Sequence, residues 1–512
     1  MKEKLQKLGN NSVGVAIKSA IVCGVLTHMF ALVNVLHNYD DIAQQPSGYG
    51  TGITSGRWFL TVFGDLCQFL GGNYNLPFVN GILFIILIAI SAGFLVSALK
   101  IHNKLYSALI GMLFVVFPSA TSTLYFRYTA VYYGVAILLA VIAAWVLRGV
   151  KYGILISAVC TALSLGIYQA YVPLTISILV LMLIQENFQD KFTFKQIFLR
   201  GLYYCAALAL GLIVYFVILK VALVLYKTEL SNYQGVGNMG MLALNDIPRL
   251  MRNAVYGVIM LPFKAYCGLN NSKIIKIAYL LIAALSATMT VYILVAKIRK
   301  IGSAVMSILL FAAFLVAVGF VEIMCPDTWI YTLMVYSFLS ISCLPIVLLE
   351  CLPDHQNNYA KRNNSIKKVV VLIVVALIIS YAYDANVSYT FTYYANRQVE
   401  NYLTSMVAQV RMTEGFDANK KWAFIGNVED SLLNSYWQYE GRYGGTEFTP
   451  WLLNRYSRYD WLQNYVGYLP PSPTEEENAW LRNLDSVQEM PVWPSYGSIK
   501  VIDEYVVIKF EN

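Results

Sequence analysis

Two adjacent carboxylates, Asp40 and Asp41, stand at the end of the first long apolar segment, which runs from about Ser12 to Leu36. Neighbouring charges at the edge of such a segment are costly to remove from water and are rarely needed for packing. A carboxylate held at a rigid helix end can take a proton from a hydroxyl group within hydrogen-bond reach. The pair therefore indicates a general base, or a base with a partner carboxylate. The alternative is that both residues only end the helix and solvate a loop.

Three cations are candidates for binding an anionic phosphate. Arg57 begins a half-apolar segment 16 residues after Asp41, Arg127 lies in a tight turn between two apolar segments, and Lys220 lies just inside the end of another. A guanidinium matches a phosphate with two parallel hydrogen bonds, and a fixed cation can neutralise a leaving phosphate. The alternative for each residue is a side chain that extends toward lipid headgroups.

A polar interruption indicates a cavity for a substrate. The apolar block of residues 152–184 is too long for one helix and short for two, and Tyr168, Gln169 and Tyr171 lie at its centre. Broken helices at membrane depth are tolerated where they line a cavity, and a buried amide needs hydrogen-bond partners. We expect these three residues, together with Trp58, to line the cavity. A belt of interfacial tyrosines is the alternative for the two tyrosines.

Metal and disulfide sites are not expected. His28 and His37 flank the acidic pair, but no second cluster of ligands accompanies them. The eight cysteines show no CxxC or metal spacing, so most of them should be small buried apolar residues. Nothing in the sequence calls for a cofactor.

The elements that position these residues are expected to be membrane spans. The chain of 512 residues is 58% hydrophobic and 13% charged, whereas a soluble globule has about a quarter of its residues charged. Apolar stretches of about 20 residues match the thickness of a bilayer. The sequence predicts about eleven spans, near residues 13–36, 77–99, 105–124, 128–147, 152–168, 170–187, 202–226, 273–296, 302–325, 328–351 and 368–390.

The basic residues predict the orientation of the spans. Lysines and arginines fall in every second connection, which the positive-inside rule places in the cytoplasm together with the N-terminus. The loops 37–76 and 228–272, and the chain after about Thr390, then lie outside a bacterial cell membrane. A helix lying in the interface is expected within residues 57–71, and an interfacial or re-entrant helix within residues 249–266. The predicted domains are a transmembrane domain, 1–390, and an outer domain, 391–512.

The outer domain is expected to be a small α/β domain. Residues 422–425, 498–502 and 505–510 have the composition of strands, and residues 473–477 have that of a capped helix start. Six of the nine tryptophans are also found here. They form either the core of the domain or a surface that stacks on sugar rings.

Several classes of function can be weighed against these features. A P-loop and a Gly-rich nucleotide loop are absent, which argues against an ATP-driven pump and a nucleotide-dependent enzyme. Nothing indicates a nucleic-acid partner. A site on the outer face has no access to sugar nucleotides, so an activated membrane lipid is the natural donor. A flippase or exporter of lipid-linked glycans and a non-catalytic envelope scaffold are the alternatives.

Several short motifs extend this interpretation to a family. Asp40-Asp41 with Ser55-Gly56-Arg57-Trp58, the segment 164–169, and the closing segment 496–499 resemble bacterial Gtr-type, serotype-conversion glucosyltransferases of the GT-C superfamily. The resemblance implies a polytopic GT-C fold and inverting transfer of a sugar, often glucose, from undecaprenyl phosphate to a cell-wall or surface polysaccharide. It also implies that Asp40 or Asp41 is the base. A small flippase and a polyprenyl-phosphate glucosyl synthase would belong to the same pathway.

Overall fold

The computed structural model describes residues 11–189, 191–231, 244–298, 300–326, 328–353, 360–428, 442–445, 452–454 and 456–511. The chain forms two compact units. The helical unit consists of Met1–Val33, Ser47–Val387 and Arg442–Gly445, and the mixed unit of Asn34–Pro46, Ser388–Gly441 and Thr446–Asn512. The division at 387–388 lies close to the boundary drawn from the sequence at residue 390, and residues 34–46 group with the mixed unit. The domain assignment itself stays a prediction.

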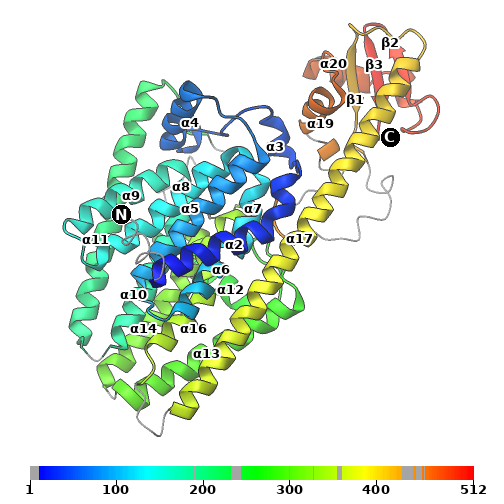
Figure 1. Cartoon of the computed structure of the whole chain (residues 1–512). Coiled ribbons are helices and arrows are strands. Elements are labelled where there is room, and N and C mark those ends of the chain that lie inside the picture. The colour runs from blue at the N-terminus through cyan, green and yellow to red at the C-terminus, as the bar shows by residue number, and fades with distance from the viewer. Residues whose placement is uncertain are drawn as a thin grey trace. The chain divides into compact units, whose positions relative to one another are not determined.

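The helical unit is built from helices that are apolar around most of their circumference, as expected for helices surrounded by lipid and by other helices. In it α2 packs against α5 and α6, α5 against α8, and α9 against α11 (Figure 1). The longer helices are α2 (Ser12–Val33), α5 (Pro77–Ala98), α6 (Lys104–Val116), α8 (Arg127–Trp145), α9 (Gly153–Ile167), α10 (Val172–Asn187), α11 (Phe194–Leu225), α13 (Lys273–Ile293), α14 (Ile301–Val318), α16 (Leu339–Glu350) and the first half of α17 (Ala360–Met412).

Shorter helices connect these elements. They are α4 (Trp58–Leu70), α7 (Pro118–Tyr125), α12 (Ile247–Met260) and α15 (Val321–Met324). The helices expected within residues 57–71 and 249–266 correspond to α4 and α12. α4 buries Trp58 and Leu60 but leaves Phe69 and Leu70 exposed. Its place in the membrane interface stays a prediction.

Nine helices in the described part of the chain are long and apolar enough to cross a membrane, so the protein is a polytopic helical membrane protein. The predicted fifth and tenth spans form shorter apolar helices, at Gly153–Ile167 and Tyr336–Glu350. The tenth is shorter because the residues before it form 3₁₀ turns. In these turns, side chains from other segments make hydrogen bonds that replace helical ones. Ser119, for example, donates to the carbonyl oxygen of Thr332 at 2.7 Å.

The break predicted within residues 164–173 is confirmed. α9 ends at Ile167, Tyr168 has an extended backbone, and a 3₁₀ turn, η3 (Gln169–Tyr171), leads into α10. Pro173 lies in the first turn of α10. A proline is tolerated there because the first N–H groups of a helix have no helical partner.

The mixed unit contains a three-stranded sheet in the order β1-β3-β2 (Figure 1). β1 (Lys421–Ile425) pairs with β3 (Tyr505–Lys509) in parallel, and β2 (Ile499–Ile502) pairs with β3 as a hairpin. All three strands match strand-like runs of the sequence. The helices here are α3 (Tyr39–Ala43), the second half of α17, α19 (Ser457–Trp461), η11 (Leu462–Val466), α20 (Glu475–Arg482) and α21 (Asp485–Gln488). α20 starts with the expected capping box at Thr474.

Tryptophans form much of the core of the mixed unit. Trp422 and Trp461 are fully buried and Trp493 is 6% exposed, packed with apolar residues of α17 and the sheet. For these three the core interpretation holds, and Trp480 is 46% exposed. Trp437 and Trp451 lie outside the described residues.

One short segment from late in the sequence belongs to the helical unit. Gly444 donates its main-chain N–H to the Thr332 hydroxyl at 2.8 Å and accepts a hydrogen bond from Ser122. Tyr443 is 2% exposed. Residues 442–445 are therefore packed against the helical unit, with Tyr443 and Gly445 buried and Arg442 and Gly444 half-buried.

Candidate active site

The acidic pair lies on α3, whose first turn is fixed by a cap. The Asn38 side chain accepts hydrogen bonds from the main-chain N–H groups of Asp40 (3.0 Å) and Asp41 (2.7 Å). Asparagine suits this position because its side-chain oxygen replaces the helical acceptors that these groups lack. Asp41 is fully buried, whereas Asp40 is half-buried. The two carboxylates therefore have different surroundings.

His37 connects Asp41 to a residue far along the chain. Its Nδ1 lies 2.6 Å from Asp41 Oδ2, and its Nε2 lies 2.7 Å from the Tyr465 hydroxyl. A neutral imidazole has one N–H and one bare nitrogen, so it can donate to the carboxylate and accept from the phenol at once. His37 is 1% exposed and Tyr465 is 40% exposed. The hydrogen bonds therefore lead from a buried carboxylate to an accessible hydroxyl.

Asn396 of α17 holds the main chain of His37. The His37 N–H donates to Asn396 Oδ1 at 2.7 Å, and Asn396 Nδ2 donates to the His37 carbonyl oxygen at 2.9 Å. One side chain thus satisfies both main-chain groups of a residue outside any helix or strand, which buried backbone requires. The backbone that carries the imidazole is therefore held in position.

Residues near α19 also contact Asp40 and His37. Tyr456, directly before α19, donates its hydroxyl hydrogen to Asp40 Oδ1. Trp461, the last residue of α19, meets the His37 ring edge to face, with 5.6 Å between ring centroids. Asp40 and His37 therefore each contact the same short helix or its flank.

Arg458 positions α19. Its guanidinium lies over the rings of Phe424 in β1 (4.5 Å) and of Phe510, which directly follows β3 (4.9 Å). Burial lowers the pKa of Arg458 to about 10, because removal from water disfavours the charged form. The buried Arg458 side chain therefore holds α19 against the sheet. Tyr456 and Tyr465 lie on either side of Arg458 in the sequence.

The sequence indicated only part of this cluster. His37 was considered there as a metal ligand and not as a hydrogen-bond partner, although it stands four positions before Asp41. Asn396, Tyr456 and Tyr465 carry no sequence signal, because they approach α3 only in the fold.

A second cluster, in the helical unit, surrounds Arg57 at the start of α4. Arg57 Nη1 donates to the hydroxyls of Thr51 (3.2 Å) and Tyr133 (3.3 Å), and its guanidinium carbon lies 4.7 Å from the centre of the Tyr168 ring. The Tyr133 and Tyr168 rings stack at 4.4 Å with 12° between their planes. A cation over an aromatic face is attracted by it. The guanidinium is therefore oriented by ring faces and hydroxyl groups.

The turn before Arg57 is held by Gln169 and Tyr215. Gln169 Nε2 donates to the Ser55 carbonyl oxygen at 2.9 Å, and the Tyr215 hydroxyl donates to that of Gly56 at 3.0 Å. Gly56 has a φ of +73°, and a methyl group there would come within 2.7 Å of the Tyr215 oxygen. Only glycine fits such a turn without strain. The buried amide predicted at residue 169 thus has its partners.

The other predicted cavity residues lie in the same neighbourhood. Tyr171 is fully buried and lies edge-on to Tyr133 (6.0 Å) and Tyr168 (5.4 Å). Trp58 is 7% exposed and packs against Gly166 of α9. The structure therefore brings the predicted cavity residues together with Arg57. Their contact with a substrate stays a prediction.

The remaining predicted cations differ in exposure. Arg127 is the first residue of α8 and is 1% exposed, which argues against a side chain that extends into the headgroups. Lys220 lies on the exposed side of α11, whereas Tyr215 and Leu219 on its buried side pack beside the turn at Gly56. A phosphate-binding role stays a prediction for both cations.

The candidate metal ligands of the sequence have other contacts. His28 Nε2 lies 2.9 Å from the carbonyl oxygen of Val115, and His37 makes the contacts described above. Within the described ranges, no three His, Cys, Asp or Glu side chains gather in a way that could hold a metal ion.

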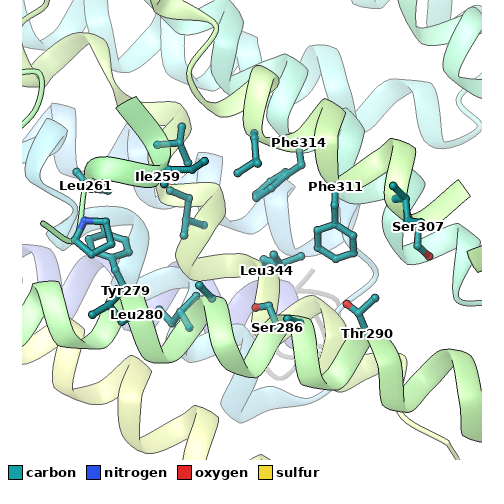
Figure 2. Close-up of a pocket in the computed structure, with 18 of the residues that line it drawn as sticks. Ile259, Leu261, Tyr279, Leu280, Ser286, Thr290, Ser307, Phe311, Phe314 and Leu344 are labelled. Carbon is teal, nitrogen blue, oxygen red and sulfur yellow. The ribbon is translucent and has the colours of Figure 1, made fainter. Parts of the chain in front are cut away.

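A cavity of about 830 Å³ opens between α12, α13, α14 and α16 (Figure 2). Its lining is apolar apart from a few hydroxyl groups on α13 and α14. The lining includes Ile259, Leu280, Phe311, Phe314 and Leu344, with the hydroxyls of Ser286, Thr290 and Ser307. Such a lining suits a hydrocarbon chain.

Comparison with known proteins gives one family. The family model described as Glucosyl transferase GtrII matches residues 29–342, which include the acidic pair, Arg57 and the break between α9 and α10. No curated protein and no solved structure gives a significant match.

Proposed function

Because the chain belongs to the GtrII glucosyl transferase family, we propose that it moves glucose from a polyprenyl-phosphate-linked donor to an envelope glycan outside the bacterial cell membrane. Undecaprenyl phosphate is the expected carrier. The observation that carries this proposal is the acidic pair of α3, fixed by Asn38, His37 and Tyr456 within a membrane protein. Such a fixed carboxylate is what a base for a sugar hydroxyl requires.

The donor is assigned from topology. The alternation of basic loops places the first loop, with the acidic pair, on the side opposite the cytoplasm. Nucleotide sugars are made in the cytoplasm, so an enzyme acting outside needs a donor that has crossed the membrane. A sugar on a polyprenyl phosphate meets that need.

The reaction is a single displacement. The acceptor hydroxyl oxygen attacks C1 of glucose from the face opposite the phosphate, and its proton passes to a carboxylate of the acidic pair. The bond between C1 and the phosphate oxygen breaks, and its electron pair stays on that oxygen. The configuration at C1 is inverted.

Arg57 is assigned to the leaving phosphate. Negative charge grows on the phosphate oxygen as the bond to C1 breaks, and a fixed cation stabilises that charge. The hydroxyls of Thr51 and Tyr133 and the face of Tyr168 orient the guanidinium before the donor arrives. Arg127 and Lys220 are further candidates for the same phosphate.

The cavity between α12, α13, α14 and α16 is assigned to the prenyl chain of the donor. α13 and α14 are candidate spans, which supports a position of the cavity at membrane depth. The exposed cation Lys264 directly follows the lining residue Phe263. An apolar cavity with a cation next to its wall suits a lipid with an anionic head.

The test is transfer of labelled glucose from undecaprenyl-phosphate glucose to isolated cell walls, with purified protein in detergent. The double variant Asp40→Asn/Asp41→Asn should lose about 10²- to 10⁴-fold of the rate, because it lacks a base. Glu476→Gln, an exposed change in the same unit, is the matched control. Transfer at the wild-type rate by the double variant would refute the proposal. Movement of the lipid across vesicles without a glycosidic bond would identify a flippase.

A further inference from the structure

The two carboxylates of α3 differ in access. Asp41 is fully buried, whereas Asp40 is half-buried. A base must come within hydrogen-bond reach of the hydroxyl that it deprotonates. Only Asp40 has surface with which an acceptor sugar can make contact.

One hydrogen-bond partner of Asp40 is itself accessible. Tyr456 is 52% exposed and donates to Asp40 Oδ1, so the carboxylate and this donor both have exposed surface. The phenol hydrogen bond also favours one orientation of the carboxylate.

Asp41 is built into a different arrangement. The Tyr465 hydroxyl, His37 and Asp41 form one chain of hydrogen bonds, in which a neutral imidazole donates to the carboxylate and accepts from the phenol. The groups that face His37 include Asp41 from α3, Tyr465 from η11, Trp461 from α19 and Asn396 from α17. A hydrogen bond to the ionised form keeps a buried carboxylate charged. A negative charge held next to Asp40 favours movement of a proton onto Asp40.

We propose that Asp40 is the catalytic base, and that Asp41, His37 and Tyr465 are positioning residues that fix α3 and its charge. This assignment rests on the proposed function and divides its acidic pair into two roles. The acceptor proton goes to Asp40, and no proton needs to leave Asp41 during the transfer.

Azide separates the two roles. Azide attacks C1 without losing a proton, so it replaces an acceptor that needs a base; the C1–O bond breaks, and the electron pair leaves with the phosphate. The probe donor is farnesyl-phosphate glucose, and the product is glucosyl azide. Asp40→Ala should lose about 10²- to 10⁴-fold of the transfer rate and regain turnover when azide is added.

The positioning variants should behave differently. Asp41→Asn and His37→Gln should lower kcat about tenfold or more, as expected for loss of hydrogen bonds to a charged group. The KM for the donor should stay unchanged, and azide should restore little. Tyr465→Phe, at an exposed position, should give the smallest loss. Size-exclusion profiles and thermal unfolding identify any variant that is misfolded.

Two results would overturn the assignment. One is rescue by azide of Asp41→Ala but not of Asp40→Ala, which would make Asp41 the base. The other is a wild-type kcat in both His37→Gln and Tyr465→Phe, which would leave the hydrogen-bond chain without a role. Wild-type transfer by every Asp40 and Asp41 variant would instead refute the proposed function.

Discussion

The two candidate clusters, one in each unit, are built from different interactions. Around α3, hydrogen bonds join polar groups, and the pair His37 and Tyr465 is separated by 428 residues of sequence. Around Arg57, an aromatic face contributes to the positioning beside two hydroxyl groups, and the partner hydroxyl of Tyr133 is 76 residues away. A proton moves along a hydrogen bond, so the carboxylate that receives it must be aligned with the group that gives it. The charge that grows on a leaving phosphate is stabilised by a cation in a fixed position. An aromatic ring can help to fix that position by attracting the cation to its face.

The comparison predicts that Arg57→Ala acts on the donor. Loss of one fixed donor at a developing charge costs on the order of 3 kcal/mol, so kcat/KM for the donor should fall by about 100-fold. The acceptor dependence should change less. Arg57→Lys restores the charge without the planar fork and should recover part of the loss. Steady-state rates at varied donor and acceptor concentrations measure both, and an unchanged donor dependence in Arg57→Ala would remove Arg57 from this role.

A smaller effect is expected at Tyr168. Tyr168→Leu removes both the ring stacked on Tyr133 and the face under the guanidinium, which together contribute about 1–2 kcal/mol. Donor use should fall by roughly tenfold. Tyr168→Phe keeps the ring and is the matched control. Equal losses in the two variants would show that the hydroxyl, rather than the ring, holds Arg57.

The smallest effect is expected in the mixed unit away from α3. Hydrogen bonds from Lys421 and from the backbone at Thr474 lower the pKa of Glu477 to about 2. A lowered pKa stabilises the fold above the ordinary pKa of the carboxyl, and this contribution disappears as the pH falls toward 2. Glu477→Gln should therefore unfold at a slightly lower temperature at pH 7. Thermal unfolding of both proteins from pH 7 to pH 3 measures the difference, which should shrink with acidity, and glucose transfer at pH 7 should not change.

Features set by local chemistry were predictable from the sequence. The apolar runs, the break around Tyr168 and the strands of the mixed unit follow from residue types and lengths alone. The predicted length of the tenth span was wrong, because side chains such as Ser119 donate hydrogen bonds to the backbone before α16 in place of helical partners.

The candidate site was predictable only where its residues are neighbours in sequence. The acidic pair, Arg57 and the segment around Gln169 stand out by type and position. Tyr133 and Tyr215 look like ordinary interfacial tyrosines until the fold brings Tyr133 to the Arg57 side chain and Tyr215 to the turn at Gly56. Asn396 and Tyr465 could not be found at all, since nothing in the sequence near them points to α3.

The segment Arg442–Gly445 has a consequence for how this protein is made and engineered. The helices that contact Gly444 are synthesised first. Residues 442–445, which belong to the same unit, leave the ribosome only when most of the chain has been synthesised. The helical unit is therefore incomplete in any C-terminal truncation that ends before residue 442. For the same reason, a chimera that exchanges everything after α17 also replaces a piece of the membrane-embedded unit.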